Sequence, residues 1–451
     1  MRLWDLDQLK RSLSARREIL AWIVTQESVQ RRERYFLSEA GRLAADQDRE
    51  ARQLSYQLRI FVRLQGKEGR QGESILKILP HRPIESQLDQ AIASAQLTDF
   101  KSWSLPQAPS CPVPEVRSFD PRVAEDINAA VEDLSQRMEK AISGVHEARF
   151  NSSELFVALH EREQHFSSGL IHRSKQTRVY AEAAFSAETK GVSDEYLETR
   201  WSVTADGLPV EKIIQESAHR ARMMLEAGRM DTEVLPVLVD SEVMLMLMNG
   251  HLSQISGSNR YHGLPCHKVG DVLIPGAEGD LLTLHLDPGF AEGADTVAIS
   301  GDGSLQKRTT LVDRNTVIQL VMDQQHGQYL DEPVTVSRGT LVLEPGSRTR
   351  EQLLAAFPRV LEVLQFSGLF SDENSGTFGS EIRLARLHDR DRGVIRTIKG
   401  GSLSGSIHEN FRNLGLSSEL THRCHFENGV PAGTGYFGPS WALLSDVSVG
   451  G

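Results

Sequence analysis

The stretch from Leu235 to Ser253 constrains the fold of this chain more than any other part of the sequence. Its first residues, Leu235 to Val239, have the short, β-branched composition of a buried strand. Asp240 and Ser241 follow, and both residue types cap helices by accepting hydrogen bonds from the first turn. The sequence therefore predicts a strand that leads directly into a helix.

The helix that begins at this point should be enclosed on all sides. Val243 to Met248 are apolar at every position, whereas a surface helix carries a polar face. Asn249-Gly250 is a helix-stop pair, so we expect the helix to end there, with His251 just beyond it. The rest of the chain must then supply apolar surroundings for this segment.

Composition is that of an acidic globular protein. Of the 451 residues, 39% are hydrophobic and 25% are charged, and the formal net charge is -11. An excess of negative charge argues against a phosphate-backbone partner, so we expect no nucleic acid to bind. The length is enough for two or three domains of about 100–200 residues each.

The sequence predicts a cytoplasmic location and no membrane partner. No apolar run approaches the ~20 residues that span a bilayer, and the first residues lack the apolar core of a signal peptide. Three cysteines in so long a chain, Cys111, Cys266 and Cys424, suit a reducing compartment better than a disulfide framework.

The N-terminal part, residues 1–230, is predicted to be an α+β domain. Helices are expected at Leu3 to Ser14, Glu85 to Leu97, Pro121 to about Ile142, and Pro209 to Ala227. Strands are expected at Ile19 to Thr25, Arg34 to Leu37, Ser55 to Leu64, Ser74 to Leu79, and between Arg149 and Phe185. The proline-rich segment from Ser102 to Pro121 is interpreted as a crossing loop.

The C-terminal part, residues 231–451, is predicted to be mainly antiparallel β-sheet with few helices. Short strands are expected at Val269 to Ile274, Leu281 to Leu286, Val297 to Ser300, Val317 to Met322, Gly339 to Leu343, Ile382 to His388, Val394 to Ile398 and Leu443 to Val449. Thr349 to Gln365 is the exception, a predicted helix that Pro358 should kink or split. The predicted fold class is α+β.

A His-Glu-x-x-x-His sequence occurs at His160 to His165, but its spacing argues against a zinc site. Residues five apart lie about 140° from each other around a helix and on opposite faces of a strand. Leu155, Val157 and Leu159 alternate just before it, which favours a strand. We interpret the two histidines as surface residues at a charged strand end.

Several glycine-rich segments of the C-terminal part form a distinctive set. They are Gly301-Asp-Gly303, Thr340 to Gly346, Ser375 to Gly379, Ile398 to Phe411 and the terminal Val449-Gly450-Gly451. Together with the apolar strand and helix, they resemble the TldD/PmbA (TldE) family of bacterial zinc metallopeptidases and their non-catalytic relatives. The resemblance covers about Leu235 to Gly451 well and the N-terminal part only loosely.

In the peptidase branch of that family, the apolar helix carries His-Glu-x-x-x-His, which supplies two zinc ligands and a general base. Aligned on Gly250-His251, this chain has Met246 for the first histidine and Leu247 for the glutamate, and keeps only His251. A thioether is a weak ligand and leucine cannot take a proton, so the family mechanism has no base here. We expect no catalytic residue and no cofactor in this chain.

Four residues remain candidates for a rearranged zinc site: His251, Cys266, His267 and Cys424. In the peptidase branch, a cysteine at a similar distance from a terminal Val-Gly-Gly completes the zinc site, as Cys424 would here. Each candidate also has a structural explanation, since His251 can be hydrogen-bonded after a helix and Cys424 can be a buried thiol. Zinc held by a protein usually takes at least three side chains.

The resemblance also implies partners. Family members pair through their C-terminal parts, and a zinc-bearing subunit with a non-catalytic one encloses a cavity where an unfolded peptide is cut. The leading hypothesis is a TldE-like subunit that forms a heterodimer with a TldD-like catalytic subunit, which carries the zinc, or a homodimer. Two alternatives remain: an active metallopeptidase with a rearranged zinc site, and a stand-alone homodimeric peptide-binding protein.

Overall fold

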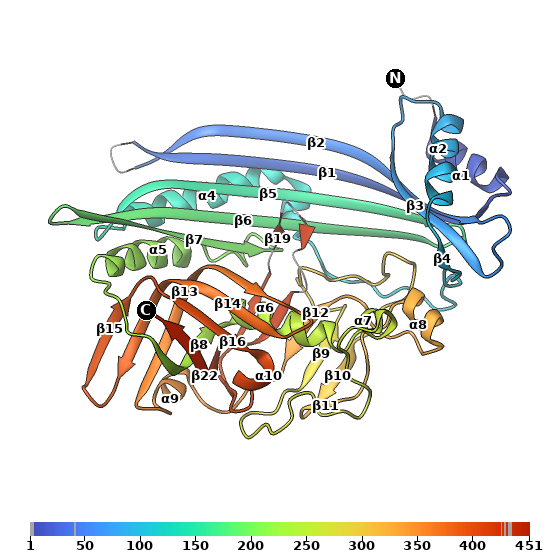
Figure 1. The fold of residues 1–451 in the computed structure, drawn as a ribbon. Coiled ribbons are helices and arrows are strands. Elements are labelled where there is room, and N and C mark those ends of the chain that lie inside the picture. The colour runs from blue at the N-terminus through green and yellow to red at the C-terminus, as the bar shows by residue number, and fades with distance from the viewer. Residues whose placement is uncertain (1–3, 40–41, 425, 428–429, 432–434) are drawn as a thin grey trace.

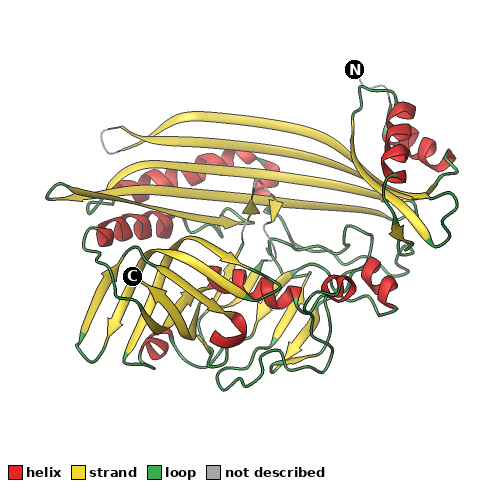
Figure 2. Ribbon diagram, in the orientation of Figure 1, coloured by secondary structure: helices red, strands yellow, loops and turns green. Residues whose placement is uncertain are grey.

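The computed structural model describes residues 4–39, 42–424, 426–427, 430–431 and 435–451. A sheet of long strands lies over a more compact C-terminal part that contains two further sheets (Figure 1). Strands outnumber helices in both parts, and nearly all strand pairs are antiparallel (Figure 2). The predicted α+β class with a β-rich C-terminal part is confirmed. Among the described helices, none is both long and apolar enough to cross a membrane.

The N-terminal sheet has seven antiparallel strands in the order β4-β3-β2-β1-β5-β6-β7. In chain order these are β1 Ile19–Glu39, β2 Arg42–Arg63, β3 Arg70–Ile78, β4 Phe100–Lys101, β5 Arg149–Phe166, β6 Ile171–Thr189 and β7 Val192–Ser202. The strand β7 forms one edge of the sheet, and it faces the C-terminal part.

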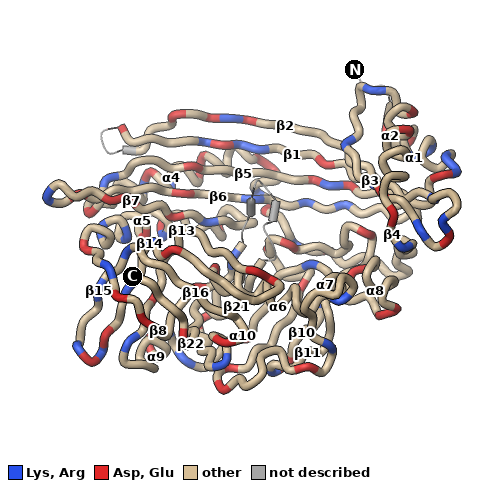
Figure 3. The backbone as a smooth tube through the Cα atoms, in the orientation of Figure 1, with Lys and Arg blue, Asp and Glu red and all other residues tan. Residues whose placement is uncertain are grey.

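The expected break between Ile19–Thr25 and Arg34–Leu37 is wrong, because β1 is one continuous strand. It pairs with β2 almost from end to end and with β5 along most of its length. Charged residues of both signs alternate along these strands (Figure 3). The charged side chains in the middle of β1 form ion pairs across the strands, such as that of Arg32 with Asp48 at 2.6 Å. Polar residues here are therefore not a turn signal.

The described residues of the N-terminal part form five helices, and the four longer ones pack on one face of its sheet. They are α1 Leu6–Ala15, α2 Ile84–Gln96, α3 Pro121–Glu125, α4 Ile127–Ser143 and α5 Val210–Met224. The single helix expected from Pro121 to Ile142 is divided at Asp126. Its carboxylate accepts hydrogen bonds from the amides of Asn128 and Ala129, so it caps a new helix instead of continuing the first.

The C-terminal part contains two larger sheets. One has the order β11-β10-β9-β12-β21-β18, and the other β13-β8-β22-β16-β14-β15, in which β13 also pairs with β14. The first sheet is built from β9 Leu284–Asp287, β10 Thr309–Asp313, β11 Thr316–Val317, β12 Thr340–Leu343, β18 Leu420–Arg423 and β21 Tyr436–Pro439. The second is built from β8 Glu233–Asp240, β13 Arg359–Ser371, β14 Thr377–Asp389, β15 Val394–Ile398, β16 Ser402–Ser406 and β22 Trp441–Gly450.

Smaller elements complete this part. They are β17 Gly415–Leu416, which pairs with β22, the two-stranded pair β19 Phe426–Glu427 and β20 Val430–Pro431, and the helices α7 Gly257–His262, α8 Gln324–Leu330, α9 Arg350–Leu354 and α10 Ile407–Asn410.

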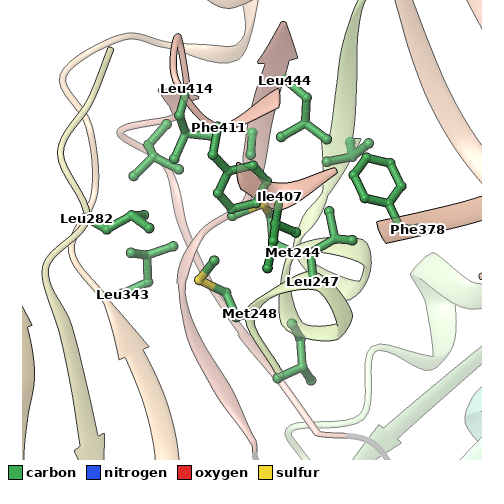
Figure 4. Packing of buried hydrophobic residues seen from close by; sticks show 14 of the residues in the cluster. Met244, Leu247, Met248, Leu282, Leu343, Phe378, Ile407, Phe411, Leu414 and Leu444 are labelled. Atoms are coloured by element: carbon green, nitrogen blue, oxygen red, sulfur yellow. The ribbon is translucent and has the colours of Figure 1, made fainter. Parts of the chain in front are cut away.

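The helix α6, Ser241–Ser253, lies in the core of the C-terminal part. As expected, the Asp240 side chain caps it by accepting hydrogen bonds from the amides of Glu242 and Val243. Met244, Leu247 and Met248 pack against side chains from several other elements (Figure 4). One helix therefore holds apolar residues from both sheets together.

The expected end of this helix at Asn249-Gly250 is wrong, because α6 runs on to Ser253. A Cβ atom at Gly250 would lie 3.0 Å from the Ile407 side chain. The glycine thus allows close packing inside a helix instead of ending it. His251 lies in the last turn of the helix, not beyond it.

Four other expectations in this part are corrected. The helix expected from Thr349 to Gln365 is only the short α9, because Pro358 ends it and β13 begins at the next residue. Val269–Ile274 and Val297–Ser300 are irregular segments with isolated bridges, not strands. Of Val317–Met322, only Val317 lies in a strand.

The position of α6 predicts the effect of truncating Leu247, which is 1% exposed. Leu247→Ala should lower the free energy of unfolding by about 2–5 kcal/mol, because buried methyl groups are lost and a cavity remains. Leu97→Ala is the matched control, since Leu97 is 88% exposed, and it should change stability by less than about 0.5 kcal/mol. Denaturant unfolding of both variants measures the difference, and equal losses would contradict this account of the core.

Candidate functional site

Two neighbouring cavities lie between the β7 edge of the N-terminal sheet and the start of α6. The first, which we call the β18 cavity, has a volume of about 250 Å³, and the second, the β13 cavity, about 280 Å³. Both are lined by Thr199 and Arg200 of β7 and by Glu242 in the first turn of α6. The two cavities are therefore adjacent parts of one site.

The β18 cavity lies where two edge strands meet. β7 ends the N-terminal sheet and β18 ends the six-stranded sheet, and an antiparallel bridge joins Trp201 to Cys424. The other lining residues are Gly207, Pro209, Lys212, Leu245, Thr421, His422 and Arg423. Among the described strands β18 pairs only with β21, apart from the bridge at Cys424, so it borders the cavity as an edge strand.

The β13 cavity combines an apolar lining with a charged wall. The apolar residues are Val243, Met246, Val363, Leu364, Phe366 and Leu369. The register of β13 against β14 shifts repeatedly between Val363 and Gly368. Such bulges bend a strand and redirect its side chains, which places this part of β13 along the cavity.

The helix α6 presents different side chains to the cavities and to the core. Leu245 lines the β18 cavity, whereas Val243 and Met246 line the β13 cavity. Leu247 is buried in the core. The expectation of a helix buried all round is therefore wrong on this side, where Val243 and Met246 are half-buried. Of the two residues aligned above with the peptidase motif, Met246 lies on the cavity wall and Leu247 lies in the core.

His251 lies on a different side of α6 from Met246. A separation of five residues corresponds to a rotation of about 140° and a rise of about 7.5 Å along the helix. The ring of His251 is fully buried, and its centroid is 5.4 Å from that of Phe411 and 6.2 Å from that of His408. Neither ring nitrogen has a hydrogen-bond partner among the described residues, so the hydrogen-bonded histidine expected here is not found.

Electrostatically, His251 is a neutral imidazole. Burial, with smaller contributions from His408 and His267, lowers the pKa of His251 to about 3. His267 and His408 are less buried, and burial lowers the pKa of each of them as well. The three rings therefore form a histidine cluster that disfavours positive charge.

The two cysteine candidates lie in different surroundings. The Cys266 thiol donates to the carbonyls of Ser256 and His267, at 3.5 and 3.2 Å. Cys424 lies at the β7–β18 bridge, 3.6 Å from Nε2 of His422. Burial raises the pKa of the Cys266 thiol and raises that of Cys424 to about 12. In the absence of a metal ion, both thiols are therefore protonated at neutral pH.

The structure thus brings some sequence candidates together and separates others. His251 and His267 are neighbours, whereas Cys424 lies with Leu245 at the β18 cavity. Throughout the described part of the chain, no three His, Cys, Asp or Glu side chains are arranged to hold a metal ion.

The His-Glu-x-x-x-His sequence lies on β5, as predicted from its alternation. His160 is 3.6 Å from the Glu27 carboxylate, and His165 bonds to Glu163 at 2.7 Å. The interpretation of both as surface residues is wrong for His165, which is 5% exposed under the helix face of the sheet. The odd spacing does place the two rings on opposite faces.

A buried ion network, which the sequence analysis missed, forms the charged wall of the β13 cavity. Glu198 of β7 is 3% exposed and bonds to Arg200 and to Arg220 of α5. Arg220 also donates to the Tyr196 hydroxyl, at 2.7 Å, and Glu216 lies 3.4 Å from Arg200. Burial lowers the pKa of Arg200 to about 10. Two sequence patterns indicate this network. Tyr196, Glu198 and Arg200 alternate on a strand, and Glu216 and Arg220 are one helical turn apart on the next helix.

This network predicts a large effect of Glu198→Gln. The variant leaves two buried guanidinium groups without their shared carboxylate, so the free energy of unfolding should fall by about 3 kcal/mol. Glu188→Gln is the control, because Glu188 is exposed on β6, and it should be near neutral. Chemical denaturation measures both, and a neutral Glu198→Gln would show that the network is not a structural support of the cavity.

The buried His251 predicts a pH dependence of stability. In the unfolded chain, histidine binds a proton below about pH 6.5, whereas the folded chain does so only near pH 3. Stability should therefore be lost as pH falls through this window, by up to about 1.4 kcal/mol per pH unit. His251→Leu should reduce this slope, because the remaining part comes from other histidines whose pKa burial also lowers, such as His267 and His408. His81→Leu controls for the loss of an exposed histidine. An unchanged slope in His251→Leu, measured by denaturation from pH 5 to about 8, contradicts the assignment.

The fold and the site together define an α+β protein in which a buried helix forms the wall of a cavity beside two edge strands. Residues 232–451 match the PmbA/TldA metallopeptidase C-terminal domain family. No curated protein sequence matches the chain. The C-terminal part of the chain therefore belongs to the TldD/PmbA family.

Solved structures share the fold over the whole chain. A candidate modulator of DNA gyrase from Bacteroides thetaiotaomicron has a TM-score of 0.77 at 16% identity, covering 99% of this chain and 98% of that one. Another from Thermotoga maritima has a TM-score of 0.76 at 15% identity, covering 99% and 100%. TldE from Thermococcus kodakarensis has a TM-score of 0.74 at 16% identity, with the same coverage.

Proposed function

We propose that this chain is a non-catalytic, TldE-like subunit that holds unfolded peptides beside its cavities. It would pair with a TldD-like subunit that carries the zinc, or with a second copy of itself. The observation that carries the proposal is the side chain at the cavity wall of α6. Where the peptidase branch has a zinc histidine, this chain has the thioether of Met246, and the base position is the buried Leu247.

The remaining candidates support a non-catalytic role through their chemistry. The Cys424 thiol at the β18 cavity stays protonated, because burial raises its pKa to about 12. His251 is at the other end of α6, packed against Phe411. Of the carboxylates that line the β13 cavity with Met246, Glu198 is held between two arginines and Asp240 caps α6. Leu247, at the position of the family's general base, cannot transfer a proton to a leaving group.

Peptide binding is supported by the strand edge at the β18 cavity. An extended peptide can add to an unpaired edge through main-chain hydrogen bonds, which read backbone and not sequence. The edge of β18 at Thr421 to Arg423 borders the cavity, whereas side chains already occupy the edge of β7. There, Gln365 donates to the Leu197 carbonyl at 3.1 Å, and Arg383 donates to that of Glu195.

A cytoplasmic location is part of the proposal. Cys111, Cys266 and Cys424 are all free thiols, which suits a reducing compartment. The substrate would then be an unfolded peptide or protein segment of the cytoplasm.

The test is to mix the purified full-length chain with a fluorescently labelled unfolded peptide. We expect saturable binding by fluorescence anisotropy, with the peptide intact by chromatography. Thr421→Trp, which fills the β18 cavity, should weaken binding by about tenfold or more. Val394→Trp, on the edge strand β15, is the control and should bind normally. Cleavage of the peptide by the chain alone would contradict the proposal and favour a rearranged zinc site.

A further inference from the structure

The N-terminal sheet has one face without helices. Its helix-covered face carries residues such as Trp22, Val24 and Phe36 of β1. On the opposite face, one end packs against the C-terminal part through a cluster that contains Ile23, Phe166 and Ile299. The rest of this second face, which we call the open face, carries the side chains that alternate with the helix-facing ones.

Four aromatic rings cross the open face in a row from β1 to β7. Tyr35, Phe156, Tyr180 and Trp201 come from β1, β5, β6 and β7, which are consecutive in the sheet. Their successive centroid distances are 5.5, 5.3 and 4.4 Å, and all four are half-buried. We call these four residues the aromatic row. Arginines of this chain already lie over two of these rings, Arg49 over Tyr35 at 4.8 Å and Arg31 over Phe156 at 5.4 Å, as expected for aromatic faces, which attract cations.

Two carboxylates lie beside this row. Glu154 and Glu182 are opposite each other on β5 and β6, and like charges in this arrangement repel. Glu182 accepts a hydrogen bond from the Tyr180 hydroxyl. Among the described residues, neither carboxylate has a salt bridge, unlike Glu33, which pairs with Arg31 at 2.5 Å.

The surroundings of Glu154 disfavour its negative charge. Burial raises the pKa of Glu154, and the carboxylates of Glu182 and Glu33 raise it further. A cation placed between Glu154 and Glu182 would remove this repulsion. The aromatic row beside them adds a surface for the hydrocarbon stem of a long basic side chain.

The aromatic row also leads to the proposed peptide site. Trp201, its last ring, lines the β18 cavity, and Thr199, which pairs with Glu182 across the strands, lines both cavities. Trp201 therefore belongs both to the aromatic row and to the lining of the β18 cavity. A free cation such as a metal would not use the rings, whereas a lysine or arginine residue would use both the rings and the carboxylates.

We propose that the aromatic row, with Glu154 and Glu182, is a subsite for a lysine or arginine side chain of an extended peptide. The proposal rests on the peptide-holding function and adds a preference to it. Main-chain hydrogen bonding at β18 does not depend on the side chains of the peptide. This subsite, in contrast, selects a basic residue that lies a fixed distance from the peptide segment bound in the β18 cavity. The net charge of -11 favours the same class of ligand over acidic peptides.

The test uses the full-length chain and three labelled unfolded peptides that differ at one central residue: lysine, norleucine or glutamate. Norleucine keeps the hydrocarbon stem and lacks the charge. We expect the lysine peptide to bind about fivefold more tightly than the norleucine peptide, as one desolvated cation contact with rings and carboxylates would give. The glutamate peptide should bind most weakly.

Variants separate the subsite from the fold. Glu154→Gln combined with Glu182→Gln should abolish the lysine preference and leave norleucine binding unchanged. Its melting temperature should not fall, because the change removes a repulsive pair. Phe156→Leu should reduce the same preference by removing a ring, and Glu188→Gln, an exposed change elsewhere on β6, should retain it.

Equal affinity for all three peptides would overturn the subsite while leaving the peptide-holding function intact. Absence of binding by every peptide would instead overturn the proposed function, and the subsite with it. A lysine preference that survives in the double glutamine variant would also overturn the assignment, because it would place the basic side chain elsewhere.

Discussion

The burial of α6 is the interaction on which the rest of the structure depends. Asp240 ends β8 and caps the helix in one step, so the strand direction fixes where the helix enters the core. Apolar side chains on most of its surface then hold elements of both C-terminal sheets. The residual surface, at Val243 and Met246, becomes the wall of a cavity. A helix with this composition can support a fold and shape a site.

The second constraint is the junction between the two halves. The edge strand β7 meets β18 at the Trp201–Cys424 bridge, and the network around Glu198 ties β7 to α5. Buried charges of this kind are costly unless every partner is present. They therefore fix the geometry of the cavity wall more than they raise stability.

Much of the core could be predicted from the sequence, because local signals and tertiary packing agree there. The cap at Asp240, the apolar helix and the strand before it are examples. Gly250 was misleading, because its small size serves packing against Ile407 and not helix termination. The polar middle of β1 was misleading too, since its charges are paired across strands that are distant in sequence. Long-range pairs of this type leave no local pattern.

The site was harder to predict than the fold. Met246 and Leu247 were recognisable as replacements only through the family resemblance, and the family profile over residues 232–451 agrees with that resemblance. Which side chain faces the cavity depends on helix rotation, and the Glu198 network depends on the contact between β7 and α5. The sequence contains the cavity-facing residues of α6 and those of the Glu198 network. Their spacing along the chain, however, does not show that β7 contacts α5.

Zinc content tests the central claim most directly. The full-length chain, purified without chelator and without added metal, is taken from its size-exclusion peak for elemental mass spectrometry. The account predicts less than about 0.1 zinc per chain, because a protein zinc site needs three or four converging ligands. Near one zinc per chain, lost in Cys424→Ala, would contradict it and establish a metal site that includes the β18 cavity.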